Sequence, residues 1–176
     1  MKTLIWQNCT EGPMTQELKN ADMVLLSEGA PWLTRVGRGI RRTKQHRSKR
    51  LKGLVINWDK EEFVVVEKGH RMFHKSGKAE GWTGIRTPAR GILFVIGYWK
   101  DDPKKRLYMY AVTHWLNSWL PAGKTDRWTF QRNTIVTETT IPVVEDLVED
   151  KKRAGAVFNG ERVDLEGGLV GGDTNS

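Results

Sequence analysis

Short apolar runs recur along the chain, separated by polar segments that contain glycine and proline. Residues 2–7 predict a short buried strand, and residues 21–27 predict a second one. The second contains an unbroken apolar run at 23–26. An unbroken run of this length favours a strand in a sheet that is covered on both faces.

Two further pairs of apolar runs have the spacing of β-hairpins. Residues 54–58 and 63–66 flank a polar segment at 59–61, and residues 91–97 and 107–112 flank a turn-rich segment at 100–104. Polar residues, glycine and proline between two strand-like runs favour a chain reversal. The pattern therefore predicts two hairpins.

Helical stretches alternate with these strands. Residues 14–19, after Pro13, predict a short helix, and residues 124–153 predict a long helical region that is interrupted near Pro142. The dipeptide Asn159-Gly160 indicates a tight turn before a last strand that leads into the final residues. Strands in hairpins, then a helix, then a strand indicate a mixed α/β layered domain rather than a helical bundle.

Composition is compatible with one soluble domain. The chain has 176 residues, of which 38% are hydrophobic and 28% charged. No apolar run approaches the ~20 residues that span a bilayer, and the apolar stretch at the N-terminus is too short for a signal peptide. The single cysteine, Cys9, is expected to be a small buried residue in a reducing, cytoplasmic environment.

The positive charge is concentrated in one segment. The chain has a formal charge of +8, whereas residues 35–52 alone carry +9, which leaves −1 for the remainder. We expect this segment to be a solvated, mobile loop that contacts the phosphate backbone of nucleic acid and becomes ordered on binding. The basic residues are Arg35, Arg38, Arg41, Arg42, Lys44, Arg47, Lys49, Arg50 and Lys52.

Polar side chains follow several predicted strands at the points where those strands end. The residues are Asn8, Glu28, His114, Asp173 and Asn175. Strand ends in layered α/β folds converge at one edge, where ligands bind. We therefore expect these five residues to form a site.

Two histidines form a second group of candidate metal ligands. His70 and His74 are four residues apart, in a glycine-containing segment with no third ligand. We interpret them as surface residues rather than zinc ligands.

The polar residues and their order resemble the endonuclease/exonuclease/phosphatase superfamily. Asn8 ends the first strand, Ser27-Glu28 stands where the family has Gln-Glu, and Thr113-His114 resembles the family's Thr-His-Leu motif. The segment 171–175, Gly-Gly-Asp-Thr-Asn, resembles Gly-Asp-Phe-Asn with threonine in place of the aromatic residue, and Arg90 resembles an arginine at a strand start. The resemblance covers nearly the whole chain.

This resemblance implies a mixed-sheet α/β/β/α layered sandwich and a metal-dependent phosphodiester hydrolase. Glu28 and Asn8 would hold Mg²⁺ or Mn²⁺, which suits oxygen ligands. Asp173 would orient and deprotonate the attacking water, and Asn8 and Asn175 would position the reacting groups. His114 would donate a hydrogen bond to the phosphate in the transition state.

The family continues beyond the motif at 171–175 with a further acidic residue and a final Asp-His pair. Residues 1–176 are therefore expected to be a single domain of this type with its C-terminal part missing, either inactive or weakly active alone.

Nucleic acid, most simply DNA, is the expected substrate. The basic segment would contact the backbone, and Trp115 and Trp119, beside His114, could stack on unpaired bases or be packed residues of the core or surface. Two alternatives remain: a phosphatase or phosphodiesterase acting on phosphoinositides or other lipid headgroups, and a nucleic-acid-binding fragment without catalysis. Metal dependence of turnover distinguishes the enzymes from the binder.

Overall fold

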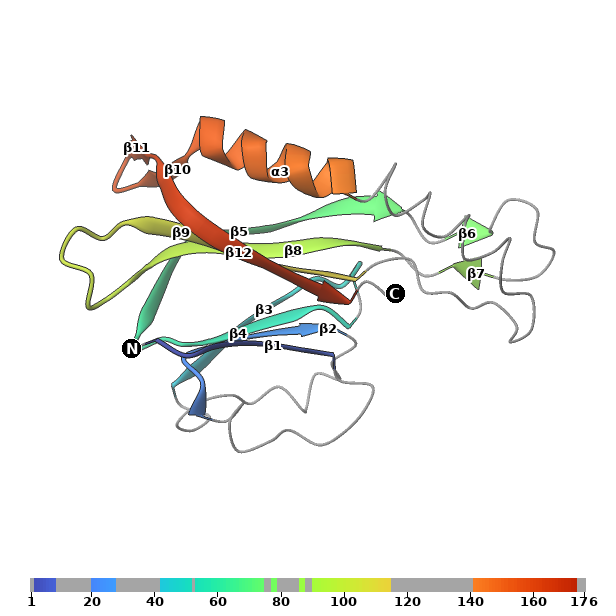
Figure 1. Cartoon of the computed structure of the whole chain (residues 1–176), viewed down its shortest axis with the longest axis horizontal. Coiled ribbons are helices and arrows are strands. Elements are labelled where there is room, and N and C mark those ends of the chain that lie inside the picture. Colours follow the sequence, from blue (N-terminus) through green and yellow to red (C-terminus); the bar gives the residue numbers. More distant parts are fainter. Residues whose placement is uncertain are drawn as a thin grey trace.

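Two four-stranded β-sheets pack face to face, and a helix covers the outer face of one of them (Figure 1). The computed structural model describes residues 2–8, 20–27, 42–51, 53–74, 77–78, 86–87, 90–114 and 141–173. Within this part of the chain, no helix is long and apolar enough to cross a membrane.

The first sheet is built around two strands with buried side chains. Its strands, in spatial order, are β1 (Leu4–Asn8), β2 (Met23–Ser27), β4 (Val55–Asp59) and β3 (Thr43–Arg47). β1 and β2 run parallel, and β4 is antiparallel to both β2 and β3. All five residues of β2 are buried, as the unbroken apolar run at 23–26 predicted.

The second sheet has the same number of strands. Its spatial order is β12 (Leu165–Asp173), β9 (Leu107–His114), β8 (Arg90–Trp99) and β5 (Phe63–His74). β12 runs parallel to β9, and β9 and β5 are antiparallel to β8. Two small hairpins lie outside the sandwich: β6 (Gly77–Lys78) with β7 (Arg86–Thr87), and β10 (Ala156–Phe158) with β11 (Glu161–Val163).

The main hydrophobic core fills the space between the sheets. Met23 and Ile56 of the first sheet belong to the same buried cluster as Leu93 and Val112 of the second. Phe63 lies in this layer against the rings of Trp99 and Tyr110, with centroids 4.9 and 5.5 Å away. The indole Nε1 of Trp99 donates a hydrogen bond of 2.8 Å to the Tyr110 hydroxyl. The only polar atoms of these two rings are therefore paired inside an apolar layer.

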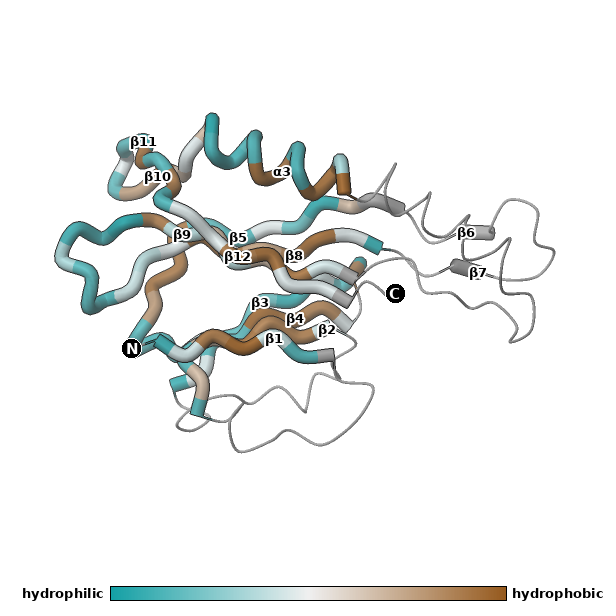
Figure 2. The backbone as a smooth tube through the Cα atoms, in the orientation of Figure 1, coloured by the Kyte–Doolittle hydropathy of each residue, from teal (hydrophilic) through white to brown (hydrophobic). Residues whose placement is uncertain are grey.

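A second apolar layer holds helix α3 (Ile141–Ala154) on the outer face of the second sheet. Leu147 is the buried residue of the helix, and it packs with Phe94 and Met109 of the sheet. Figure 2 shows the hydrophobic turns of the helix directed toward the strands. Pro142 lies in the first turn, where a missing N–H costs nothing, so it begins this helix.

The expected hairpin between residues 54–58 and 63–66 is wrong. β4 and β5 are both strands, but they belong to different sheets, and β5 pairs with β8. Residues 60–62 carry the chain across the sandwich, and the carboxylate of Asp59 accepts a hydrogen bond from the Glu61 amide. Alternation along a strand identifies its buried face but not its partner, which explains the error.

Other predicted turns are confirmed. β8 and β9 form the second hairpin, in which Asp102 accepts bonds from the Lys104 and Arg106 amides. Asn159 and Gly160 connect β10 to β11 with φ angles of 53° and 82°. Two central residues with positive φ are what a two-residue hairpin turn requires.

The basic segment is not entirely a loop, which corrects the expectation for residues 43–47. These residues form β3, an edge strand that pairs along its length with β4. Leu51, just beyond it, is only 1% exposed. Helix formation at 14–19 and at 124–140 lies outside the described residues.

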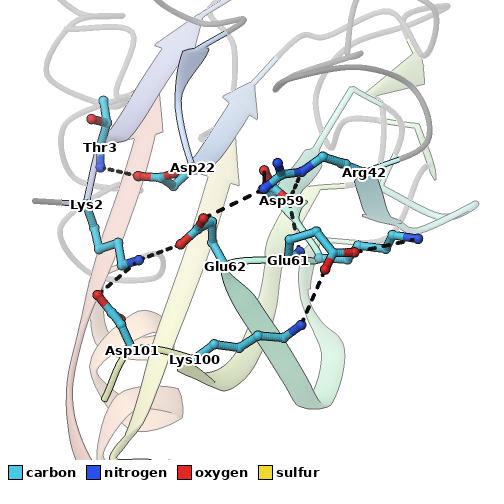
Figure 3. A network of polar contacts seen from close by, with 10 residues as sticks. Lys2, Thr3, Asp22, Arg42, Asp59, Glu61, Glu62, Lys100 and Asp101 are labelled. Atoms are coloured by element: carbon cyan, nitrogen blue, oxygen red, sulfur yellow. Dashed lines mark hydrogen bonds and ion pairs between the residues drawn. The ribbon is translucent and has the colours of Figure 1, made fainter. Parts of the chain in front are cut away.

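Ion pairs tie together the end of the sandwich where β1, β2, β3 and β5 begin (Figure 3). Arg42 makes two contacts with the buried carboxylate of Asp59, at 3.1 and 2.8 Å, and lies 3.7 Å from Glu62. Lys2 contacts Glu62 at 2.7 Å and Asp101 at 3.1 Å. Paired contacts around a buried carboxylate stabilise more than isolated surface pairs do.

His46 connects the edge strands of the two sheets. Its Nε2 lies 3.1 Å from the carbonyl oxygen of Gly69 in β5, to which the ring N–H donates. Burial lowers the pKa of His46 below its ordinary value, and the charges of Lys68 and His70 lower it further, against the hydrogen bond to Gly69. The neutral ring is therefore the form that the fold favours.

Gly168 is needed for the parallel pairing of β12 with β9. A Cβ atom on Gly168 would lie 2.2 Å from the carbonyl oxygen of Met109, whereas a Cβ on Gly167 would meet nothing within 4 Å. We expect Gly168→Ala to lower the free energy of unfolding by about 1–3 kcal/mol. Gly167→Ala, the matched control, should change it by less than ~1 kcal/mol. Urea denaturation followed by tryptophan fluorescence measures both, and equal values would contradict this pairing.

The lowered pKa of His46 predicts a loss of stability in acid. The unfolded chain binds a proton at His46 below pH ~6.5, whereas the folded chain resists protonation until lower pH. The contribution of His46 to stability is therefore present above pH ~6.5 and is lost as the pH falls through the folded-state pKa. We expect His46→Gln to flatten this part of the stability profile in thermal denaturation between pH 5 and 8. His70→Gln removes only the smallest of the contributions to the lowered pKa of His46, so it should retain most of the decline.

Candidate active site

The strands of both sheets present one set of ends at the same edge of the sandwich (Figure 1). In the first sheet, Asn8 is the last residue of β1 and pairs in register with Ser27, the last residue of β2. Arg47, the last residue of β3, pairs with Val55 at the start of β4, on the same side. We call this edge of the two sheets the rim.

The second sheet places three polar residues side by side at the rim. Asp173 of β12 pairs in register with His114 of β9, and His114 pairs with Gly91 of β8. Arg90 precedes Gly91. Neighbouring strands are about 4.8 Å apart, so the backbones of Asp173, His114 and Arg90 lie within two strand spacings, or about 10 Å. A carboxylate, an imidazole and a guanidinium are thus carried by adjacent strands.

Contact between the two sheets brings both groups to one place. The site of a Cβ atom on Gly171 of β12 lies 2.8 Å from the ring of Trp6 in β1. Trp6 is two residues before Asn8, and Gly171 is two residues before Asp173. The two strands therefore end next to each other. The absence of a side chain at Gly171 permits this approach, because the indole ring takes the space of a Cβ.

Two polar side chains at the rim are buried. Arg90 is 6% exposed and Ser27 is fully buried. Among the described residues, the Ser27 Oγ has no hydrogen-bond partner. A buried hydroxyl with no partner is costly and is one sign of a site that accepts a ligand. Arg90 places a buried positive charge at the rim, and its signal in the sequence was a charged residue opening an apolar strand.

Two of the five residues predicted for the site lie outside the described residues. Glu28 directly follows Ser27, and Asn175 is two residues beyond Asp173. For Asn8, His114 and Asp173 the structure gives the positions of the backbone. It brings these three to one edge, and their catalytic roles stay predictions.

The donors at the rim fit a hard cation. Asn8, Ser27 and Asp173 offer amide, hydroxyl and carboxylate oxygens, which are the ligands that Mg²⁺ and Mn²⁺ prefer. The described residues contain no group of three His, Cys, Asp or Glu side chains that could hold a metal. His70 is exposed on β5, which agrees with its interpretation as a surface residue. A magnesium site here would depend on Glu28, next to Ser27.

The basic residues predicted to bind nucleic acid divide into three groups. Arg42 is engaged by Asp59 and Glu62 in the ion-pair network, away from the rim (Figure 3). Lys44, Arg47, Lys49 and Arg50 are exposed or half-buried on or just after β3. The remaining members of the set, and the two tryptophans beyond His114, lie outside the described residues; they are Arg35, Arg38, Arg41, Lys52, Trp115 and Trp119.

Comparison with known proteins identifies the fold. No family model and no curated protein matches the sequence. An endonuclease/exonuclease/phosphatase family protein from Bacteroides thetaiotaomicron matches the structure with a TM-score of 0.51 and 14% identity, over 89% of this chain and 49% of that one. A mannosyl-6-phosphatase of the same organism gives a TM-score of 0.51 and 14% identity, over 88% of this chain and 51% of that one.

The chain spans about half the length of the solved structures that it matches, and over that length it has the fold of the endonuclease/exonuclease/phosphatase family.

Proposed function

We propose that this chain carries the site of a Mg²⁺-dependent phosphodiester hydrolase that acts on nucleic acid, most simply DNA. The observation that supports it is the strand register at the rim. It sets Asp173 beside His114 in one sheet and Asn8 beside Ser27, which precedes Glu28, in the other.

The proposed roles follow from the chemistry of these groups. Asp173 would orient the attacking water and take its proton, because a carboxylate at the reacting phosphate is a suitable general base. His114, one strand away, would donate a hydrogen bond to a phosphate oxygen and stabilise the charge that develops there. Asn8 and Asn175 would hold the reacting groups in position through their amides.

Glu28 and Asn8 would hold the metal, with the buried hydroxyl of Ser27 beside them. When bound, Mg²⁺ would neutralise negative charge on the phosphate. The guanidinium of Arg90 adds a positive charge at the rim to that of the metal, and this charge is present whether or not the metal is bound. A phosphate group placed between the two sheets would thus meet cationic groups from both sides.

The choice of substrate rests on charge. The basic segment 35–52 matches a polyanion better than a single phosphate group. The second candidate is a phosphatase for a small molecule or lipid headgroup, because one structural neighbour is a mannosyl-6-phosphatase. A panel of supercoiled DNA, RNA, sugar phosphates and phosphoinositides would separate these. Release of inorganic phosphate without strand cleavage would favour the second candidate.

Removal of the Asp173 carboxylate tests the proposed base. We expect Asp173→Asn to slow Mg²⁺-dependent nicking of supercoiled plasmid by about 10²-fold or more, because proton transfer by a positioned group contributes ~10²–10⁴-fold. Asp164→Asn is the matched control, since Asp164 is exposed and precedes β12 at the far end from the rim. Turnover is expected to be slow, so the assay uses excess protein and long incubation. Equal Mg²⁺-dependent nicking by both variants would contradict the proposed role of Asp173.

Removal of the Glu28 charge tests the metal site independently of turnover. Glu28→Gln keeps the shape of the side chain, and we expect it to weaken Mg²⁺ binding at least tenfold because the cation loses a charged oxygen ligand. Isothermal calorimetry and the Mg²⁺-dependent shift in melting temperature both measure the effect. Glu61→Gln, at an exposed position in the connection between the sheets, is the control. A Mg²⁺ response in Glu28→Gln equal to that of the parent would exclude Glu28 as a ligand.

A further inference from the structure

We propose that nucleic acid binds along one side of the sandwich, where the edge strands of the two sheets meet, and is led from there to the rim. This surface, the basic seam, consists of Lys44, Lys49, Arg50, Lys68 and His70. It rests on the proposed function for the class of substrate, and it adds residues of β5 that lie outside the basic segment.

The two edge strands are in direct contact. β3 is an edge of the first sheet and β5 is an edge of the second. The ring of His46 bonds to the carbonyl oxygen of Gly69 at 3.1 Å and so connects them. Lys44 is two residues before His46 on the same face of β3, whereas Lys68 and His70 flank Gly69 in β5. Basic side chains from both sheets are therefore brought together at this junction.

Alternation along β5 shows which side chains face the seam. Glu67 contacts Lys151, and Arg71 lies 2.7 Å from Asp150; both partners belong to α3, on the outer face of the sheet. Lys68 and His70 alternate with these two residues, so their side chains point the opposite way, toward the first sheet. Met72, on this inner side, packs against the core between the sheets. Lys68 and His70 consequently lie at the open side of that core.

Charge along the seam is of one sign. Residues 43–50 and 68–70 contain five Lys and Arg residues and no Asp or Glu. The nearby carboxylates are occupied elsewhere: Glu67 by Lys151, Asp150 by Arg71, and Asp59 by Arg42. The lowered pKa of His46, to which Lys68 and His70 contribute, agrees with a positive potential at this place. Like charges held close together favour a polyanion as the counterpart.

The direction of the seam suits a substrate that reaches the rim. β3 ends at the rim with Arg47, and Lys49 and Arg50 follow it. β5 ends on the same side, where His74 pairs with Arg90. Six residue steps from Lys44 to Arg50 cover at most ~20 Å, which matches about six phosphates along one DNA strand at 3.4 Å each.

Charged residues on an edge strand also discourage pairing with other chains. That role accounts for exposed lysines on either edge taken alone. It does not require both edges to carry a lysine beside one contact between the sheets, as Lys44 and Lys68 do beside the contact of His46 with Gly69. The arrangement across both sheets therefore favours a bound ligand.

Lys68 provides the specific test, because it lies in β5, outside the basic segment. We expect Lys68→Gln to weaken binding of a fluorescent 20-base-pair DNA duplex about eightfold at 0.1 M KCl and to reduce the log–log salt slope by about 0.9. The double variant Lys44→Gln/Lys68→Gln should reduce the slope by about 1.8 and weaken binding about 60-fold. Lys104→Gln, equal in charge and exposed at the other end of the sandwich, should leave both quantities unchanged.

The measurement is fluorescence anisotropy with the parent chain and these variants. Identical affinity and slope for Lys68→Gln and Lys104→Gln would overturn the seam, even if substitutions at Lys49 and Arg50 weaken binding. Weaker association of Lys68→Gln with phosphatidylserine vesicles, together with unchanged DNA binding, would also overturn it and would indicate a membrane surface. Thermal melting of each variant shows whether the fold is retained.

Failure of the seam and failure of the proposed function give different results. Hydrolysis of bis(p-nitrophenyl) phosphate, which is too small to reach the seam from the rim, should be unchanged by Lys68→Gln and lowered by Asp173→Asn. DNA binding should show the reverse pattern. Loss of DNA binding in Lys68→Gln, together with equal metal-dependent hydrolysis in Asp173→Asn and the parent, would support the seam and reject the proposed catalytic role of Asp173.

Discussion

Burial of the inner faces of β2 and β4 against β8 and β9 fixes the position of one sheet relative to the other. This apolar layer has little tolerance for movement, because protein interiors are close-packed. The rim depends on it, because Asn8 and Asp173 belong to different sheets and lie at the same edge only while their strands are held in this packing. The contact of Trp6 with Gly171 completes the alignment close to the strand ends.

The two ends of the sandwich differ in how their polar groups are used. At one end, an ion-pair network pairs the charged side chains with one another; its members are Arg42, Asp59, Glu62, Lys2 and Asp101. At the other, the described residues include a buried serine hydroxyl without a partner and a buried arginine. Groups that are mutually satisfied stabilise the fold, whereas a buried hydroxyl without a partner among the described residues can take one from a ligand. Charge at the rim is therefore compatible with stability because packing and ion pairs elsewhere support the strands.

In our proposals, binding and catalysis use different parts of the same β-sandwich. The strand ends at the rim supply the reacting groups, and the edge strands supply the cations that bind the nucleic acid. The edges are suited to this because residues on them reach solvent while their backbone remains paired on one side. His46, kept neutral by burial, holds the two edges together without adding a charge to those that the substrate must neutralise.

The sequence by itself determined most strands of the two sheets and the placement of Asn8, His114 and Asp173 at strand ends. Runs such as 23–26 and 91–97 contain no polar side chain, which is typical of short strands that are buried on both faces. Asn159-Gly160 readily adopts the positive φ angles of a tight turn. Local pattern could not decide which strands pair, because alternation is the same whichever neighbour a strand has. The tertiary structure therefore decided that β4 and β5 lie in separate sheets, and that residues 43–47 form an edge strand. It also decided that His46 of one sheet contacts Gly69 of the other, since packing between sheets joins residues that are far apart in the chain.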